Sequence, residues 1–138
     1  MVVRVKLRVS DESRSVELVA LVNSGYEADG PQLMVPVGIA RRLGYWPPPP
    51  GALERVFETA GGPLRVWVIP RAVKVKVVAS DAESGEVTAD LVISQVTGEA
   101  LISDVLCDEL GIAIERPGKG LWRFRWEPPD KVRGSEGA

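Results

Sequence analysis

The sequence predicts a single, mainly β domain, and three observations indicate this fold class. Apolar and polar side chains alternate with a period of two over most of the 138 residues, as in half-buried strands. Only two short stretches have helical spacing, and no long helices alternate with the strands, so a doubly wound parallel sheet is not expected. We expect one domain over residues 1–127, large enough for a core without disulfides, and a polar, disordered tail over 128–138.

The first two strands are predicted to form a hairpin. Residues 2–10 alternate apolar side chains with Arg4, Lys6 and Arg8, and residues 15–22 return as a second apolar strand. The turn-forming residues between them join the two. Three further strands are expected over residues 64–69, 72–79 and 86–94, the last two joined by the polar loop 80–86.

Two short helices are expected among these strands. The first covers residues 36–43, where proline is acceptable in the first turn and Gly44 stands just past the end. The second covers residues 103–110, with Ser103 as N-cap and Gly111 as the C-terminal stop. The prolines at 47–50 between the first helix and the later strands predict a stiff surface loop.

Composition narrows the classes of function. The chain contains no histidine, which excludes Ser-His and Cys-His catalysis and most zinc sites. Its net charge of −2 gives no reason to expect nucleic acid, and no apolar run approaches the length needed to cross a bilayer. One cysteine without a partner favours a reducing cytoplasm, and the scarcity of asparagine and glutamine favours a heat-adapted source. We expect neither a cofactor nor a metal.

Four segments occur in an order that carries a resemblance. LVALVNSG (18–25) is an apolar strand running into a turn, and VPVGIARRLG (35–44) is a helix closing in Leu-Gly. VFETAGGPLRVWVI (56–69) has small residues where a hairpin would turn, and ALISDVLCDELGIAIE (100–115) contains a second helix closing in Leu-Gly. In this order and spacing, the chain resembles the retropepsin-like (retroviral-type) aspartic proteases of small prokaryotic or archaeal type, over roughly residues 14–116.

The resemblance implies an all-β acid-protease barrel that forms a homodimer, with an extended peptide bound in a cleft at the interface under two flaps. The position of the catalytic aspartate is occupied by Asn23, with Ser24 hydrogen-bonded beneath it and Gly25 letting the turn approach the twofold axis. The family's second signature has glycine where this chain has Ser103. Expected contacts to the peptide are Asp29 in the loop after the turn and, at the flap tip, Thr59, Ala60, Gly61 and Gly62.

Asparagine at position 23 changes the expected chemistry. Aspartic proteases share one proton between two close carboxylates, one acting as base and the other as acid. An amide is a very poor base and no useful acid, and general acid–base catalysis is worth about 10²–10⁴ in rate. We therefore expect no activity. Asn23 is the only asparagine in the chain. Four explanations remain open: natural loss of the catalytic aspartate, engineered inactivation, partial deamidation of Asn23 to aspartate, and an asparagine that serves only as a turn residue.

Other segments leave a second class of function open, a non-enzymatic all-β protein-interaction module. It would use the proline loop and the strand 121–126, where Trp122, Phe124 and Trp126 alternate with arginines. Such interleaving can also stack on nucleic acid, but an aromatic face packed on the barrel or on a second subunit is favoured.

The second helix carries two further groups that are candidate sites. Asp104 and Asp108 share one face of it with Glu109 nearby, and a hard cation could lie between them, although solvated surface is the favoured interpretation. Cys107 is expected to be a buried structural thiol, because no histidine is available to activate it.

Overall fold

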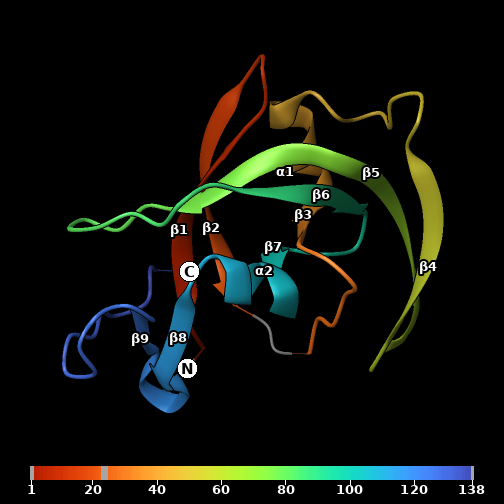
Figure 1. Cartoon of the computed structure of the whole chain (residues 1–138). Coiled ribbons are helices and arrows are strands. Elements are labelled where there is room, and N and C mark those ends of the chain that lie inside the picture. The colour runs from red at the N-terminus through yellow and green to blue at the C-terminus, as the bar shows by residue number, and fades with distance from the viewer. Residues whose placement is uncertain (1, 23–24, 138) are drawn as a thin grey trace.

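Six strands close into a barrel in the computed structural model, which describes residues 2–22 and 25–137 (Figure 1). Strands hold 49% of the residues and helices 12%, which confirms the mainly β fold class and the two short helices. The elements are β1 (Arg4–Ser10), β2 (Ser15–Val22), β3 (Gln32–Pro36), α1 (Val37–Leu43), β4 (Leu53–Thr59), β5 (Gly62–Val77), β6 (Val87–Ser94), β7 (Ala100–Ile102), α2 (Asp104–Glu109), β8 (Ile112–Arg116), the 3₁₀ turn η1 (Pro117–Lys119) and β9 (Leu121–Phe124).

The barrel strands follow the order β1-β2-β7-β3-β6-β5, and β5 pairs with β1 to close the ring. The predicted hairpin of β1 and β2 is confirmed, with antiparallel register from Arg4 opposite Leu21 to Ser10 opposite Ser15. β5 also pairs with β4, which has no other strand partner in the described parts of the chain. Residues 62–65 of β5 pair with β4 alone, so the end of the β4–β5 hairpin extends beyond the barrel as an arm (Figure 1).

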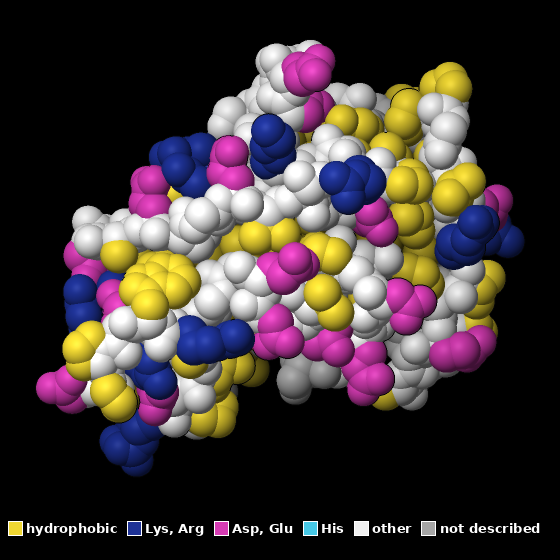
Figure 2. Space-filling model, viewed as in Figure 1, with side chains coloured by type: hydrophobic (Ala, Val, Ile, Leu, Met, Phe, Trp, Pro, Cys, Tyr) yellow, Lys and Arg dark blue, Asp and Glu magenta, His cyan; other side chains and the backbone are white. Residues whose placement is uncertain are grey.

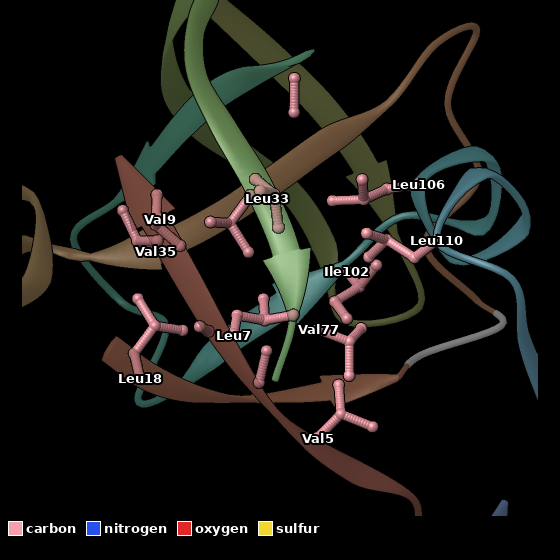
Figure 3. Packing of buried hydrophobic residues seen from close by; sticks show 14 of the residues in the cluster. Val5, Leu7, Val9, Leu18, Leu33, Val35, Val77, Ile102, Leu106 and Leu110 are labelled. Atoms are coloured by element: carbon pink, nitrogen blue, oxygen red, sulfur yellow. The ribbon is translucent and has the colours of Figure 1, made fainter. Parts of the chain in front are cut away.

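The core lies inside the barrel because alternate residues of each strand point inward. Val5, Leu7 and Val9 of β1 are fully buried, while Arg4, Lys6 and Arg8 face outward, as the alternation predicts. Figure 3 shows Val77 of β5 beside them and Leu106 and Leu110, at the α2 end of the barrel, reaching toward Ile102. Burying such apolar side chains is the main stabilising term, at about 25 cal/mol per Å².

Strand β5 corrects one prediction. The stretches 64–69 and 72–79 belong largely to one strand of 16 residues rather than to two strands. A register shift between Ile69 and Val73 marks a bulge in the pairing with β6, and Arg71 has a φ of 51° there. The Arg71 backbone N–H donates to Asp90 Oδ1 of β6 at 2.8 Å. The strand therefore bends at Pro70 and continues, instead of ending there in a turn.

Both predicted helices are confirmed. α1 follows Pro36, and its end is capped by Gly44 at a φ of 86°, a left-handed conformation that favours glycine. α2 is capped by Ser103, whose Oγ accepts a hydrogen bond from the Leu106 backbone N–H at 3.2 Å. Within the described residues, neither helix has the length and apolar character required to span a bilayer.

The C-terminal segment packs on β9. Trp122 and Phe124 are buried and belong to the core cluster, whereas the exposed Trp126 ring stacks on Phe124 at 4.6 Å between centroids. Trp122 and Arg133 exchange backbone hydrogen bonds of 3.0 and 2.7 Å, and the Glu136 backbone N–H donates to Arg4 O at 3.0 Å. Residues 128–137 thus make specific contacts, which differs from the disorder that their polar composition predicts. The aromatic rings of β9 and the ion pairs of Arg133 with Glu127 and Asp81 hold the segment.

Candidate functional site

The end of β2 and the end of β7 lie side by side. The two strands are parallel, with Ala20 opposite Ala100 and Val22 opposite Ile102, so their carboxyl ends reach the same edge of the sheet. The loop 25–31 follows β2, and α2 follows β7. This register brings the loop after the LVALVNSG motif against the N-terminus of α2. Asn23 and Ser24, two of the predicted site residues, lie outside the described residues.

Hydrogen bonds fasten loop 25–31 to α2. The Asp104 backbone N–H donates to Tyr26 O at 2.8 Å, and Asp104 Oδ1 accepts from the Ala28 backbone N–H at 3.1 Å. The buried Ser103 Oγ accepts from the Gln32 backbone N–H at 3.0 Å as well as from Leu106. The serine that departs from the resembled signature is therefore used as a connection between α2 and the start of β3.

The tip of the β4–β5 hairpin has a defined conformation. Thr59 Oγ1 donates to Gly62 O at 2.7 Å and accepts from the Gly61 backbone N–H at 3.2 Å. Gly62 has a φ of 110°, which side chains other than hydrogen disfavour. Ala60 and Gly61 form the two-residue connection between the paired Thr59 and Gly62. The tip is thus a tight turn built from small residues, as the sequence predicts.

A pocket of about 710 Å³ lies between loop 25–31 and this hairpin. Its apolar surface comes from Met34, Leu64 and Leu101 together with the rings of Tyr26 and Phe57. Five of the predicted site residues line it: Gly25, Asp29, Thr59, Ala60 and Gly61. The predicted Gly62 does not line it, because it lies on the β5 side of the turn and serves the turn geometry.

Tyr26 links the two walls of the pocket. Its hydroxyl donates to Gln32 Oε1 at 2.9 Å, and its ring lies 6.4 Å from the Phe57 ring of the hairpin. Burial raises the pKa of Tyr26 far above its usual value, and the negative charge of Asp90 raises it further. The phenol is therefore neutral at physiological pH and acts as a packing and hydrogen-bonding group.

Sequence reasoning missed the apolar part of the pocket. Tyr26 directly follows the turn motif, and Phe57 lies two residues before Thr59 of the hairpin turn, so these positions are the signals that the sequence offers. The sequence offers no signal for Met34 and Leu101, because they lie opposite each other only through the antiparallel pairing of β3 with β7. Their common face becomes visible only when both strands are placed in the sheet.

The charge of the pocket is one-sided. Glu27, Asp29 and Glu58 contribute three carboxylates to the lining, and all three side chains are exposed. Among the lining residues that the structure describes, none is a lysine or an arginine. A second hollow of about 590 Å³, beside the β1–β2 turn, is lined by Asp11, Arg71, Lys74 and other mostly polar residues and contains none of the predicted site residues.

The remaining candidates have structural partners. Asp104 is engaged by backbone N–H groups, and Asp108 pairs with Arg125 at 3.3 Å, so these carboxylates do not face each other as an open cation site. Burial raises the pKa of the Cys107 thiol to about 11, and the charge of Asp108 adds to this, so little of the reactive thiolate forms at neutral pH. No family model matches the chain, and no curated protein matches it.

Proposed function

We propose that this protein is a retropepsin-like aspartic peptidase scaffold that binds extended peptides and is catalytically silent because Asn23 occupies the position of the catalytic aspartate. One observation carries the proposal. Gly25 of the NSG motif, Asp29 of the following loop and the hairpin tip, Thr59 to Gly61, line one pocket although about 30 residues separate the loop from the tip in the sequence. This is the juxtaposition that the resemblance implies for a substrate cleft and its flap.

The shape of the pocket supports an extended peptide as ligand. An apolar floor under a polar rim accommodates alternating side chains, which is how strands present them. The hairpin arm offers peptide groups as well, because β4 pairs only with β5 in the described parts of the chain. A peptide added along such an edge gains main-chain hydrogen bonds, while the floor selects its side chains.

The proposed assembly is a homodimer. One chain carries one NSG motif, and the resembled chemistry needs two, so a complete cleft requires a second copy related by a twofold axis. In this arrangement the two Asn23 side chains meet at the axis. Replacing paired aspartates by amides removes the repulsion between like charges there. The same change that abolishes catalysis should therefore stabilise the dimer.

Restoring the acid tests the proposal. The Asn23→Asp variant should cleave an unfolded protein substrate at acid pH, with inhibition by pepstatin, while the parent chain and the matched Asn23→Ala variant should not. Light scattering coupled to size exclusion should give the mass of a dimer for all three. A folded, dimeric Asn23→Asp variant that cleaves nothing between pH 3 and 7 would contradict the proposal, as would a monomeric parent chain.

The alternative, a protein-interaction module without peptidase ancestry, draws on one observation. Trp126 is 61% exposed, which is unusual for a large aromatic side chain. Trp122 and Phe124 face the core, however, so the aromatic strand offers a single exposed ring and not a face. Loss of partner binding after Trp126→Ser, without effect on peptide binding, would favour this alternative.

A further inference from the structure

The three carboxylates of the pocket stand on two separate elements. Glu27 and Asp29 belong to loop 25–31, and Glu58 belongs to the hairpin arm. Among the residues that the structure describes, none of the three makes a salt bridge or a side-chain hydrogen bond with the rest of the chain. Their charges are therefore available to a ligand.

Basic residues of the neighbouring hairpin do not neutralise this rim. Arg65 Nε pairs with Glu54 Oε1 at 3.0 Å, and Arg55 donates to a backbone carbonyl; neither lines the pocket. The chain as a whole has a net charge of only −2, so three uncompensated negative charges at one pocket are a local concentration. Figure 2 shows acidic side chains along the lower right of the molecule, where Figure 1 places loop 25–31 and the hairpin tip.

The acidic rim borders an apolar floor. Met34 and Leu101 lie on the sheet, and the rings of Tyr26 and Phe57 connect the loop to the hairpin above it. A ligand that matches both features carries a cationic group a few ångströms from a large apolar group. Lysine and arginine meet this requirement in a peptide, because their apolar stems pack along such a floor while the charge stays at the wet rim.

We propose that the pocket selects extended peptide segments in which lysine or arginine stands next to a large apolar residue. This inference rests on the proposed function and names the substrate class of that same site. A metal ion is a poorer match, because the described residues contain no group of three or more acidic or other ligating side chains close enough to hold one. A negatively charged ligand is disfavoured by the same three carboxylates.

Fluorescence anisotropy of labelled peptides tests the inference on the parent chain, which should bind without cleaving. Three peptides share one apolar core of leucine and phenylalanine and differ only in the flanking residues, which are lysine, serine or glutamate. At low ionic strength we expect the lysine peptide to bind about tenfold more tightly than the serine peptide, with the glutamate peptide weakest. Added salt should reduce these differences, since the rim is exposed.

Variants locate the effect. The triple variant Glu27→Gln, Asp29→Asn, Glu58→Gln should lose the preference for lysine, so that it binds the lysine and serine peptides with equal affinity. Glu109→Gln, an exposed carboxylate of α2 outside the pocket, is the matched control and should change nothing.

The outcomes separate the two proposals. Equal affinity for all three peptides, or an unchanged lysine preference in the triple variant, would overturn the inference and leave the peptide cleft standing. Failure of every peptide to bind would overturn the inference together with the proposed function. Displacement of the lysine peptide by spermidine as effectively as by unlabelled peptide would also overturn it, because the site would then recognise cations without the apolar neighbour.

Discussion

Replacing Arg133 by alanine should destabilise the protein strongly although the residue lies near the C-terminus. Its guanidinium makes two hydrogen bonds of 2.6 Å to the carboxylate of Glu127 and further bonds of 2.8 and 3.0 Å to Asp81. It also lies 5.2 Å from the centre of the Trp122 ring and 5.1 Å from that of Phe124. One side chain thus joins the C-terminal segment, the 80–86 loop and the aromatic strand.

The burial of the Arg133 and Glu127 side chains determines how much stability Arg133→Ala should lose. The side chains of Arg133 and Glu127 are only 12% and 7% exposed, so Arg133→Ala leaves a buried carboxylate without its main partner. Breaking such a pair costs about 3–5 kcal/mol. Lys131, at 3.4 Å from Glu127, and the backbone N–H of Phe124 offset part of this. We therefore expect a loss of about 3 kcal/mol in the free energy of unfolding, or roughly 10 °C in Tm.

Urea denaturation followed by tryptophan fluorescence measures the loss. Arg8→Ala is the matched control, because it removes an exposed pair with Glu17 at 3.0 Å and should cost less than about 1 kcal/mol. A loss for Arg133→Ala no larger than that for Arg8→Ala would refute the reasoning.

The pH dependence of stability is a second test of the Arg133–Glu127 ion pair. The hydrogen bonds from Arg133 lower the pKa of Glu127 from 4.5 to about 2. A carboxyl whose pKa is lower in the folded than in the unfolded state contributes stability above the unfolded value and loses it as pH falls toward the folded value. Stability should therefore fall between about pH 4.5 and 2, and the fall should be smaller in Arg133→Ala.

Two further predictions concern α2. Ser103→Ala should lower the free energy of unfolding by about 2–3 kcal/mol, because it removes the acceptor of two backbone N–H groups, those of Leu106 and Gln32. Urea denaturation measures this loss, and Ser13→Ala on the exposed turn is the control. Equal losses of stability in the two variants would contradict the prediction. Cys107 should react with Ellman's reagent at pH 8 about a hundredfold more slowly in the folded protein than in urea, because its pKa rises from 9.0 to about 11 on folding; equal rates in the two states would show that the thiol is not shielded.

Much of the candidate site was predictable because its parts are local. The apolar strand before the NSG motif, the two helix caps and the small residues of the hairpin turn each depend on a few neighbouring residues. The resemblance then placed Gly25, Asp29 and the hairpin tip in one cleft, and the structure brings these residues to one pocket. The apolar floor was not predictable, because Met34 and Leu101 meet only through the pairing of β3 with β7.

The sequence by itself determined the strands β1, β2 and β6, the positions of the two short helices, and which faces of the β1–β2 hairpin are apolar. These properties follow from periodicity and from hydrogen bonds between near neighbours. Only the tertiary structure decided that β5 continues through its kink, since Asp90 of the adjacent strand binds the Arg71 backbone there. Only the tertiary structure also decided that the polar C-terminal segment is held in place. Arg133 contacts Asp81 and the aromatic rings of β9, and no local sequence pattern predicts these contacts.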